Sequence, residues 1–159
     1  MHRYLRTILF AALALVTTPA LAQVQKFPAG GSLSDMPFSE SVRAGGLLFI
    51  SGQVGSDDSG DLVDGGITPE SHQVMRNIRD IVDRRGLTVN DVVKCTVFLA
   101  DVSQWSDFNQ VYTTYFSKPY PARSALGANG LALGAALEVE CIAAYPQRPE
   151  PRPKNDERP

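Results

Sequence analysis

Arg123 has the surroundings that most favour binding chemistry in this sequence. It follows the run Pro119-Tyr120-Pro121, which holds the backbone extended, and glycines follow it at positions 127, 130 and 134. A guanidinium on a rigid backbone suits the two-pronged binding of a carboxylate. The sequence therefore predicts an anion-binding arginine on an extended segment.

Glu138 and Glu140 are the other candidates for a reactive site. They alternate with apolar residues in the run 137–144 (LEVECIAA), so both carboxylates are expected on one face of a strand. If that face lines a cleft, one carboxylate could orient a water molecule. Surface carboxylates in salt bridges are the commoner outcome of such spacing, and the pattern alone leaves both interpretations open.

Histidine chemistry has little support in the chain. His2 lies in a predicted leader, and His72 lies on the opposite side of a predicted helix from Val74 and Ile78, which indicates a solvated surface residue. There is no P-loop, dinucleotide fingerprint, HExxH or CxxC motif. We therefore expect neither a metal site nor a cofactor.

The two cysteines, Cys95 and Cys141, are too far apart in sequence for a metal knuckle. Both fall on the apolar side of predicted strands, so buried thiols facing the helices are expected. A bridge between adjacent strands is the alternative, because an exported protein meets oxidising conditions.

The first 22 residues resemble a secretory signal peptide. Arg3 and Arg6 precede an apolar stretch at 8–16, and small residues precede a predicted cleavage site after Ala22. Nine apolar residues are far short of the roughly 20 that span a bilayer. The mature protein is therefore expected in the periplasm or secreted, without membrane attachment.

The folded domain is expected at 23–145. Residues 146–159 hold five prolines, seven charges and no large apolar side chain, which predicts a disordered tail. The 159-residue chain carries a net charge of −2, and removing the leader takes away two arginines and no acid. Without a basic stripe, a nucleic-acid partner is not expected.

The first half of the domain predicts two strands and a helix. Residues 23–35 are expected as irregular chain, followed by strands at 38–42 and 47–54. The helix is expected to begin with Thr68 as its N-cap and Pro69 at its first position. Gly86 is expected to end it.

The second half predicts a strand, a helix and a final strand. The strand spans 92–100, and the helix is started by Ser103 or Ser106 and ends before Pro119. One face of this helix is apolar and largely aromatic, and it comprises Trp105, Phe108, Val111, Tyr112, Tyr115 and Phe116. One face of the preceding strand is also apolar, and it comprises Val93, Cys95, Val97 and Leu99.

Together these elements predict an α+β fold, with both helices covering one face of a mixed sheet. Its other face is half polar, judged from Glu138, Glu140, Ile142 and Ala144. Such a face suits a subunit interface that contains clefts.

Four segments make the chain similar to the RidA family (YjgF/YER057c/UK114). They are Phe49-Ile50-Ser51-Gly52-Gln53, the run 92–99 (VVKCTVFL), Asn109 with Tyr112, and Tyr120-Pro121-Ala122-Arg123-Ser124 continuing to Leu137-Glu138-Val139-Glu140. The resemblance covers 38–144. It implies a chorismate-mutase-like fold assembled as a homotrimer, with sites in clefts between subunits.

The resemblance also implies an activity: hydrolysis of reactive enamines and imines to 2-oxo acids and ammonia, without a cofactor or metal. Arg123 matches the family arginine that binds the substrate carboxylate, and Glu138 matches the residue proposed to activate water. Ser51, Gly52 and Asn109 match positions that line the same cleft. The implied partner is an imino or oxo acid.

Two positions depart from the family pattern. Phe38 stands where deaminases of the family commonly have a tyrosine, in a segment that closes the cleft, and Ala125 stands where many relatives have cysteine. Because Phe38 lacks the hydroxyl, binding of a small carboxylate without turnover stays open as the alternative to hydrolysis. An RNA-directed role has been attributed to some relatives, but the acidic domain argues against it.

Overall fold

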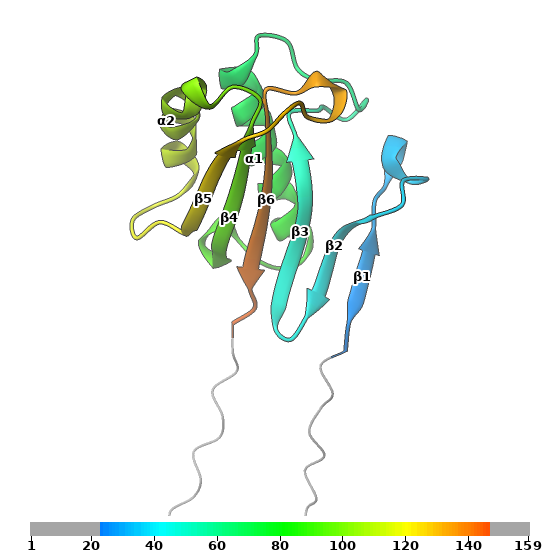
Figure 1. Ribbon diagram of the computed structural model, residues 1–159. Coiled ribbons are helices and arrows are strands. Elements are labelled where there is room, and N and C mark those ends of the chain that lie inside the picture. The colour runs from blue at the N-terminus through cyan, green and yellow to red at the C-terminus, as the bar shows by residue number, and fades with distance from the viewer. Residues whose placement is uncertain (1–22, 147–159) are drawn as a thin grey trace, which may run out of the picture.

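The computed structural model describes residues 23–146, which form one mixed sheet with two helices on one of its faces (Figure 1). The strands lie in the order β1-β2-β3-β6-β4-β5, with β4 and β5 parallel and every other pair antiparallel. This confirms the predicted α+β class. The elements are β1 Gln25–Pro28, β2 Ser39–Ala44, β3 Leu47–Val54, α1 Ile67–Arg84, β4 Val92–Leu99, α2 Trp105–Tyr115, β5 Ala122–Gly127 and β6 Leu137–Ala144, with single 3-10 turns at Gly31–Leu33, Val89–Asp91, Val102–Gln104 and Ala132–Gly134.

The core lies between the helices and the inner face of the sheet. On β6 the side chains alternate as predicted, with Leu137, Val139, Cys141 and Ala143 buried. They pack against the apolar stripe of α1, which includes Val74, Met75, Ile78, Ile81 and Val82. Burial of these two apolar faces supplies the main driving force for the fold.

Helix α1 begins earlier than predicted. Its N-cap is Gly66, whose carbonyl oxygen accepts a hydrogen bond from the Glu70 N–H, so Thr68 is not the cap and Pro69 is the third helical residue. Proline is tolerated there because the first N–H groups of a helix have no partner within it. The end is as predicted, with Gly86 in the left-handed region at φ 73°.

Helix α2 is also started differently from the prediction. Neither Ser103 nor Ser106 caps it; instead the Asp101 carboxylate accepts a hydrogen bond from the Ser103 N–H and begins a 3-10 turn that leads into the helix. Trp105 is exposed, whereas Phe108 and Tyr112 are buried in the core. The apolar face of this helix is therefore buried from Phe108 onward and not at Trp105.

Two strands were not predicted. The segment 23–35, expected to be irregular, contains β1, a short edge strand that pairs with β2. The segment around Arg123 was expected to be extended, and it forms β5, the opposite edge, paired in parallel with β4. Neither sequence alternates clearly between apolar and polar residues, and most side chains of both strands are exposed.

The predicted inward face of β4 is wrong at one position. Val93 is exposed and Val92 is buried, whereas Cys95, Val97 and Leu99 face the core as expected. The pairing of β4 with β6 shifts between Val92 and Lys94. A bulge adds one residue to a strand and reverses the alternation on one side of it.

Cys95 and Cys141 form a disulfide between β4 and β6, so the expectation of free thiols is wrong and the alternative holds. The two residues are direct partners in the register, with their Cα atoms 4.1 Å apart and both side chains buried. Directly opposed antiparallel residues come this close at their non-hydrogen-bonded positions.

The predicted leader, residues 1–22, lies outside the described residues, as does the predicted tail from residue 147 onward. Within 23–146, no helix has both the length and the apolar character needed to cross a bilayer.

Candidate functional site

A cavity of about 980 Å³ opens where β2 separates from β3. The two strands pair from Ser41 and Ile50 down to the hairpin turn, and above that point they diverge (Figure 1). The cavity is bounded by the chain before β2, the upper part of β3, the second half of α1 and the start of β6. Four of the predicted site residues line it: Phe38, Ser51, Gly52 and Glu138.

Glu138 lies directly over Gly52. A Cβ atom on residue 52 would be 2.7 Å from the Glu138 Cδ atom and closer still to Oε1. Gly52 has no positive φ, so the need for glycine comes from this close approach and not from its backbone conformation. The glycine thus leaves room for the carboxylate beside the strand that lines the cavity.

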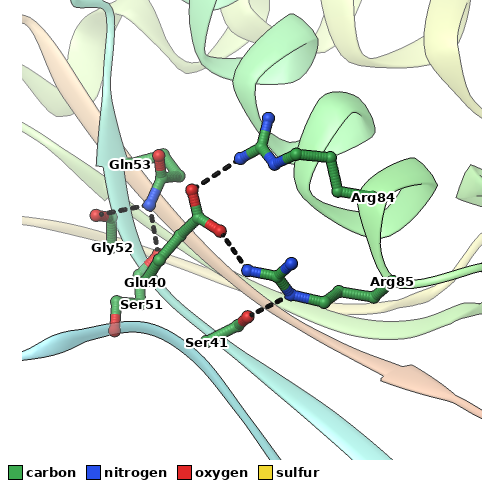
Figure 2. A network of polar contacts seen from close by, with 7 residues as sticks. All are labelled: Glu40, Ser41, Ser51, Gly52, Gln53, Arg84 and Arg85. Carbon is green, nitrogen blue, oxygen red and sulfur yellow. Dashed lines mark hydrogen bonds and ion pairs between the residues drawn. The ribbon is translucent and has the colours of Figure 1, made fainter. Parts of the chain in front are cut away.

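Ser51 and Gln53 hold the backbone around that glycine. The Ser51 hydroxyl donates to the Ser39 carbonyl at 2.7 Å, joining the diverging strands. The Gln53 amide donates to the Ser51 and Gly52 carbonyls at 3.0 and 3.1 Å (Figure 2). The Ser51 hydroxyl therefore helps to position the chain that carries Phe38 over the cavity.

A cluster of charges that sequence analysis missed forms the cavity wall beside α1. The Glu40 carboxylate lies between Arg84 and Arg85 and pairs with both, and Arg85 also donates to the buried Ser41 hydroxyl (Figure 2). The Arg85 guanidinium stacks on Phe27 at 4.0 Å. The sequence predicts the two arginines only as helix-terminal cations, and no local signal links them to a glutamate 44 and 45 residues earlier in the chain.

Arg123 lies away from the cavity. On β5 it is the register partner of Cys95, so its side chain points to the helix-covered face, where its guanidinium donates to the Asn109 Oδ1 atom at 2.6 Å. It lies 4.6 Å from the Tyr112 ring centroid and 5.6 Å from that of Phe108. No carboxylate within 23–146 forms an ion pair with it.

Tyr112 beneath this arginine is buried. Burial raises the pKa of its phenol, and the positive charge of Arg123 acts in the opposite direction. Its hydroxyl finds no hydrogen-bond partner in the described part of the chain. The ring therefore serves Arg123 as a flat surface beneath the guanidinium, which is a cation–π arrangement.

One chain does not bring the two groups of predicted site residues together. Arg123 is aligned with Cys95 on β4, whereas Glu138 is aligned with Phe98, three residues further along. Three residues of strand span about 10 Å, and the two side chains point to opposite faces. Phe38, Ser51, Gly52 and Glu138 thus form one group, and Arg123 with Asn109 forms another.

His72 is half-buried between the helices, so its prediction as a solvated residue is wrong. Its Nδ1 atom lies 3.3 Å from the Tyr115 hydroxyl, which donates to the His72 carbonyl at 3.1 Å. The second helix covers a side of α1 that appears polar from its own sequence. Across residues 23–146, no group of three His, Cys, Asp or Glu side chains is placed to hold a metal ion.

Several solved protein structures are similar to this chain in both fold and sequence. RidA from an Antarctic Psychrobacter bacterium shares 35% identity at a TM-score of 0.67, covering 79% of this chain and 99% of that one. A yeast structure, YEO7, shares 32% identity at a TM-score of 0.70, covering 78% of this chain and all of that one.

The profile of the family described as Endoribonuclease L-PSP matches residues 32–145. The mouse protein named 2-iminobutanoate/2-iminopropanoate deaminase is 42% identical over 108 residues, covering 67% of this chain and 80% of its own. Protein HMF1 of Saccharomyces cerevisiae is 34% identical over 130 residues, covering 82% and 98%. The chain belongs to the RidA family (YjgF/YER057c/UK114), which includes proteins named as imine deaminases.

Proposed function

We propose that this protein hydrolyses reactive imines and enamines derived from amino acids, releasing 2-oxo acids and ammonia. The observation that carries the proposal is the Glu138 carboxylate, which lies over Gly52 beside an open cavity. Arg123 supports it as a cation without a carboxylate partner in the described chain, stacked on an aromatic ring and oriented by Asn109. The names of the mammalian relatives point to the same chemistry.

The reaction needs only positioning and one proton acceptor. Arg123 binds the substrate carboxylate, and Glu138 takes a proton from water as the water oxygen bonds to the C=N carbon and the π electrons move to nitrogen. A protonated imine gives a neutral carbinolamine in this step, and Glu138 then returns the proton to its nitrogen. The C–N bond breaks and ammonia leaves as the C=O bond forms, while Glu138 takes the hydroxyl proton. An enamine enters the same route after protonation at carbon.

We place the complete site between subunits of a homotrimer. In an imino acid the carboxylate is bonded to the C=N carbon, so Arg123 and Glu138 must act on neighbouring atoms. Within one chain they face opposite sides of the sheet. A cyclic arrangement that brings β5 of one subunit to the cavity of the next would unite them.

Subunit mixing tests this arrangement. Arg123→Ala and Glu138→Gln chains are expected to be inactive alone. In trimers reassembled from equal amounts, about a quarter of the sites would receive both native residues, so activity should return to about that fraction. If the mixture stays inactive although mass spectrometry shows mixed oligomers, the shared site is wrong.

Export to the periplasm or the exterior remains part of the proposal. It rests on the charge and hydropathy pattern of residues 1–22. Mass spectrometry of the protein from its producing cells should find mature chains that begin at Gln23. An intact leader on the cytosolic protein would contradict export.

Binding of a small carboxylate without turnover is the second candidate function. Phe38 favours it, because it lines the cavity with an exposed ring and offers no hydroxyl to a substrate or water. The deciding experiment measures 2-oxo acid released from imines that an amino-acid oxidase generates in the assay. Acceleration that Arg123→Ala abolishes supports hydrolysis; ligand-dependent thermal stabilisation without any acceleration supports binding alone.

A further inference from the structure

Glu70 is a buried carboxylate that the proposed mechanism does not use. It lies in the first turn of α1, and only 6% of its surface is exposed. Burying a carboxylate is costly unless the group is hydrogen-bonded, and here the Oε2 atom accepts a hydrogen bond from the Ala136 N–H at 2.8 Å. Glu70 does not line the cavity, so any influence on the site must pass through the residues that it contacts.

The hydrogen bond from Ala136 holds the chain at the start of β6, two residues before Glu138. The Ala136 carbonyl accepts from the Ala100 N–H at 2.9 Å, which extends the pairing of β4 with β6 by one step. On the other side of β6, the pairing with β3 ends at Val54 and Glu138. A backbone N–H beyond the end of a strand pair still needs an acceptor, and the Glu70 carboxylate supplies it.

Glu70 also packs against the end of β3. Gly55 follows Val54, the register partner of Glu138. A Cβ atom on residue 55 would lie 2.7 Å from the Glu70 Cβ atom and 2.8 Å from its Cα atom, so the helix backbone itself approaches the strand. Glu70 therefore contacts both of the chains that pair at Glu138, one through packing and the other through a hydrogen bond.

We infer that Glu70 is a positioning residue for the water-activating carboxylate: it fixes the start of β6 against the end of β3 and thereby the place of Glu138 over Gly52. The inference rests on the proposed hydrolysis, in which Glu138 is aimed at one water molecule. Misplacing a reacting group by about 1 Å can lower a rate by about 10²-fold. All the contacts of Glu70 described above lie within one chain, so they do not depend on a neighbouring subunit.

Two substitutions at Glu70 separate the hydrogen bond from the charge. Glu70→Gln keeps a carbonyl oxygen at the same reach and loses the charge, whereas Glu70→Asp keeps the charge and shortens the reach by one methylene group. With an imine generated by an amino-acid oxidase, Glu70→Asp should lower kcat about tenfold or more and change KM by less than about twofold, because Arg123 is not displaced. Glu70→Gln should retain kcat within about threefold of the native value.

Ser71→Ala is the matched control. Ser71 is fully buried at the next position of α1, and its hydroxyl donates to the Ile67 carbonyl, so this substitution removes a buried hydrogen bond that stays within the helix. It should leave kcat and KM unchanged. A native kcat in Glu70→Asp, or a loss in Glu70→Gln equal to that in Glu70→Asp, would overturn the positioning role while hydrolysis stood.

A spectroscopic measurement separates this inference from the proposed function. The side-chain carboxyl ¹³C signal of Glu138, assigned by its absence in Glu138→Gln, should shift in Glu70→Asp and keep its native position in Glu70→Gln and Ser71→Ala. The spectra are recorded at a temperature at which each variant is folded. If no imine is hydrolysed, hydrolysis fails, and this signal alone decides the role of Glu70. An unmoved signal in Glu70→Asp overturns that role, whether or not the protein is an enzyme.

Discussion

Gly52→Ala tests the close contact on which the proposed mechanism depends. The new Cβ atom would lie 2.7 Å from the Glu138 Cδ atom, against about 3.5–4.0 Å for an ordinary carbon contact. The carboxylate must therefore move by about 1 Å, and a displacement of that size can lower a rate by about 10²-fold. The backbone need not change, because Gly52 has no positive φ and the obstructing atoms belong to the end of a flexible side chain.

We therefore expect kcat/KM for an amino-acid-derived imine to fall about 10²-fold in Gly52→Ala, while the unfolding free energy changes by no more than about 0.5 kcal/mol. The assay measures 2-oxo acid release, with urea unfolding of the same preparation. Gly30→Ala is the matched control, because Gly30 lines the same cavity and a Cβ atom there meets nothing within 4 Å. Normal turnover in Gly52→Ala, with Glu138→Gln inactive, would show that the observed carboxylate position is not the catalytic one.

Three further substitutions test the other parts of the structure. Arg123→Ala should abolish the acceleration of 2-oxo acid release, and Arg123→Lys should recover only part of this loss, since an ammonium lacks the two-pronged geometry; full recovery by lysine in steady-state kinetics would contradict the binding mode. Tyr112→Phe should leave the free energy of unfolding unchanged or raise it by about 1 kcal/mol, because the buried hydroxyl has no partner in the described chain; a large loss in urea unfolding would reveal a hidden partner. Replacing Cys95 and Cys141 together with alanine opens a link across 46 residues and should cost about 3–4 kcal/mol, measured by the same method; an unchanged unfolding midpoint, or free thiols in the oxidised protein, would refute the disulfide's role.

The sequence predicted those elements whose local pattern agrees with their environment. The bounds of β6 follow from strict alternation of apolar and other residues, and the end of α1 follows from Gly86, which takes the left-handed conformation. The errors have local causes. The bulge near Val93 reverses alternation within β4, and β1 is an edge strand too short to show a pattern. Both depend on pairing with neighbouring strands, and neither residue propensities nor hydrophobic periodicity carry information about that pairing.

The site was predictable in its residues more than in its arrangement. Resemblance to the family directed attention to Arg123 and Glu138, and the structure places Glu138 with Ser51 and Gly52 in one cavity. The contact between Glu138 and Gly52 joins residues 86 positions apart on paired strands, so only the sheet register reveals it. The ion pairs of Glu40 with Arg84 and Arg85 likewise join residues far apart in the sequence, so no local pattern predicts them.

The separation of Arg123 from Glu138 follows from register and has a consequence for assembly. Cys95 faces the helices, and its parallel partner Arg123 must do the same; Glu138 lies between the inward-facing Leu137 and Val139 and must face outward. No rotation of either side chain carries it through the sheet. If both residues act on one substrate, the carboxylate-binding half and the water-activating half must come from different chains. The open, half-polar face of the sheet would then cover the substrate only in the assembled protein.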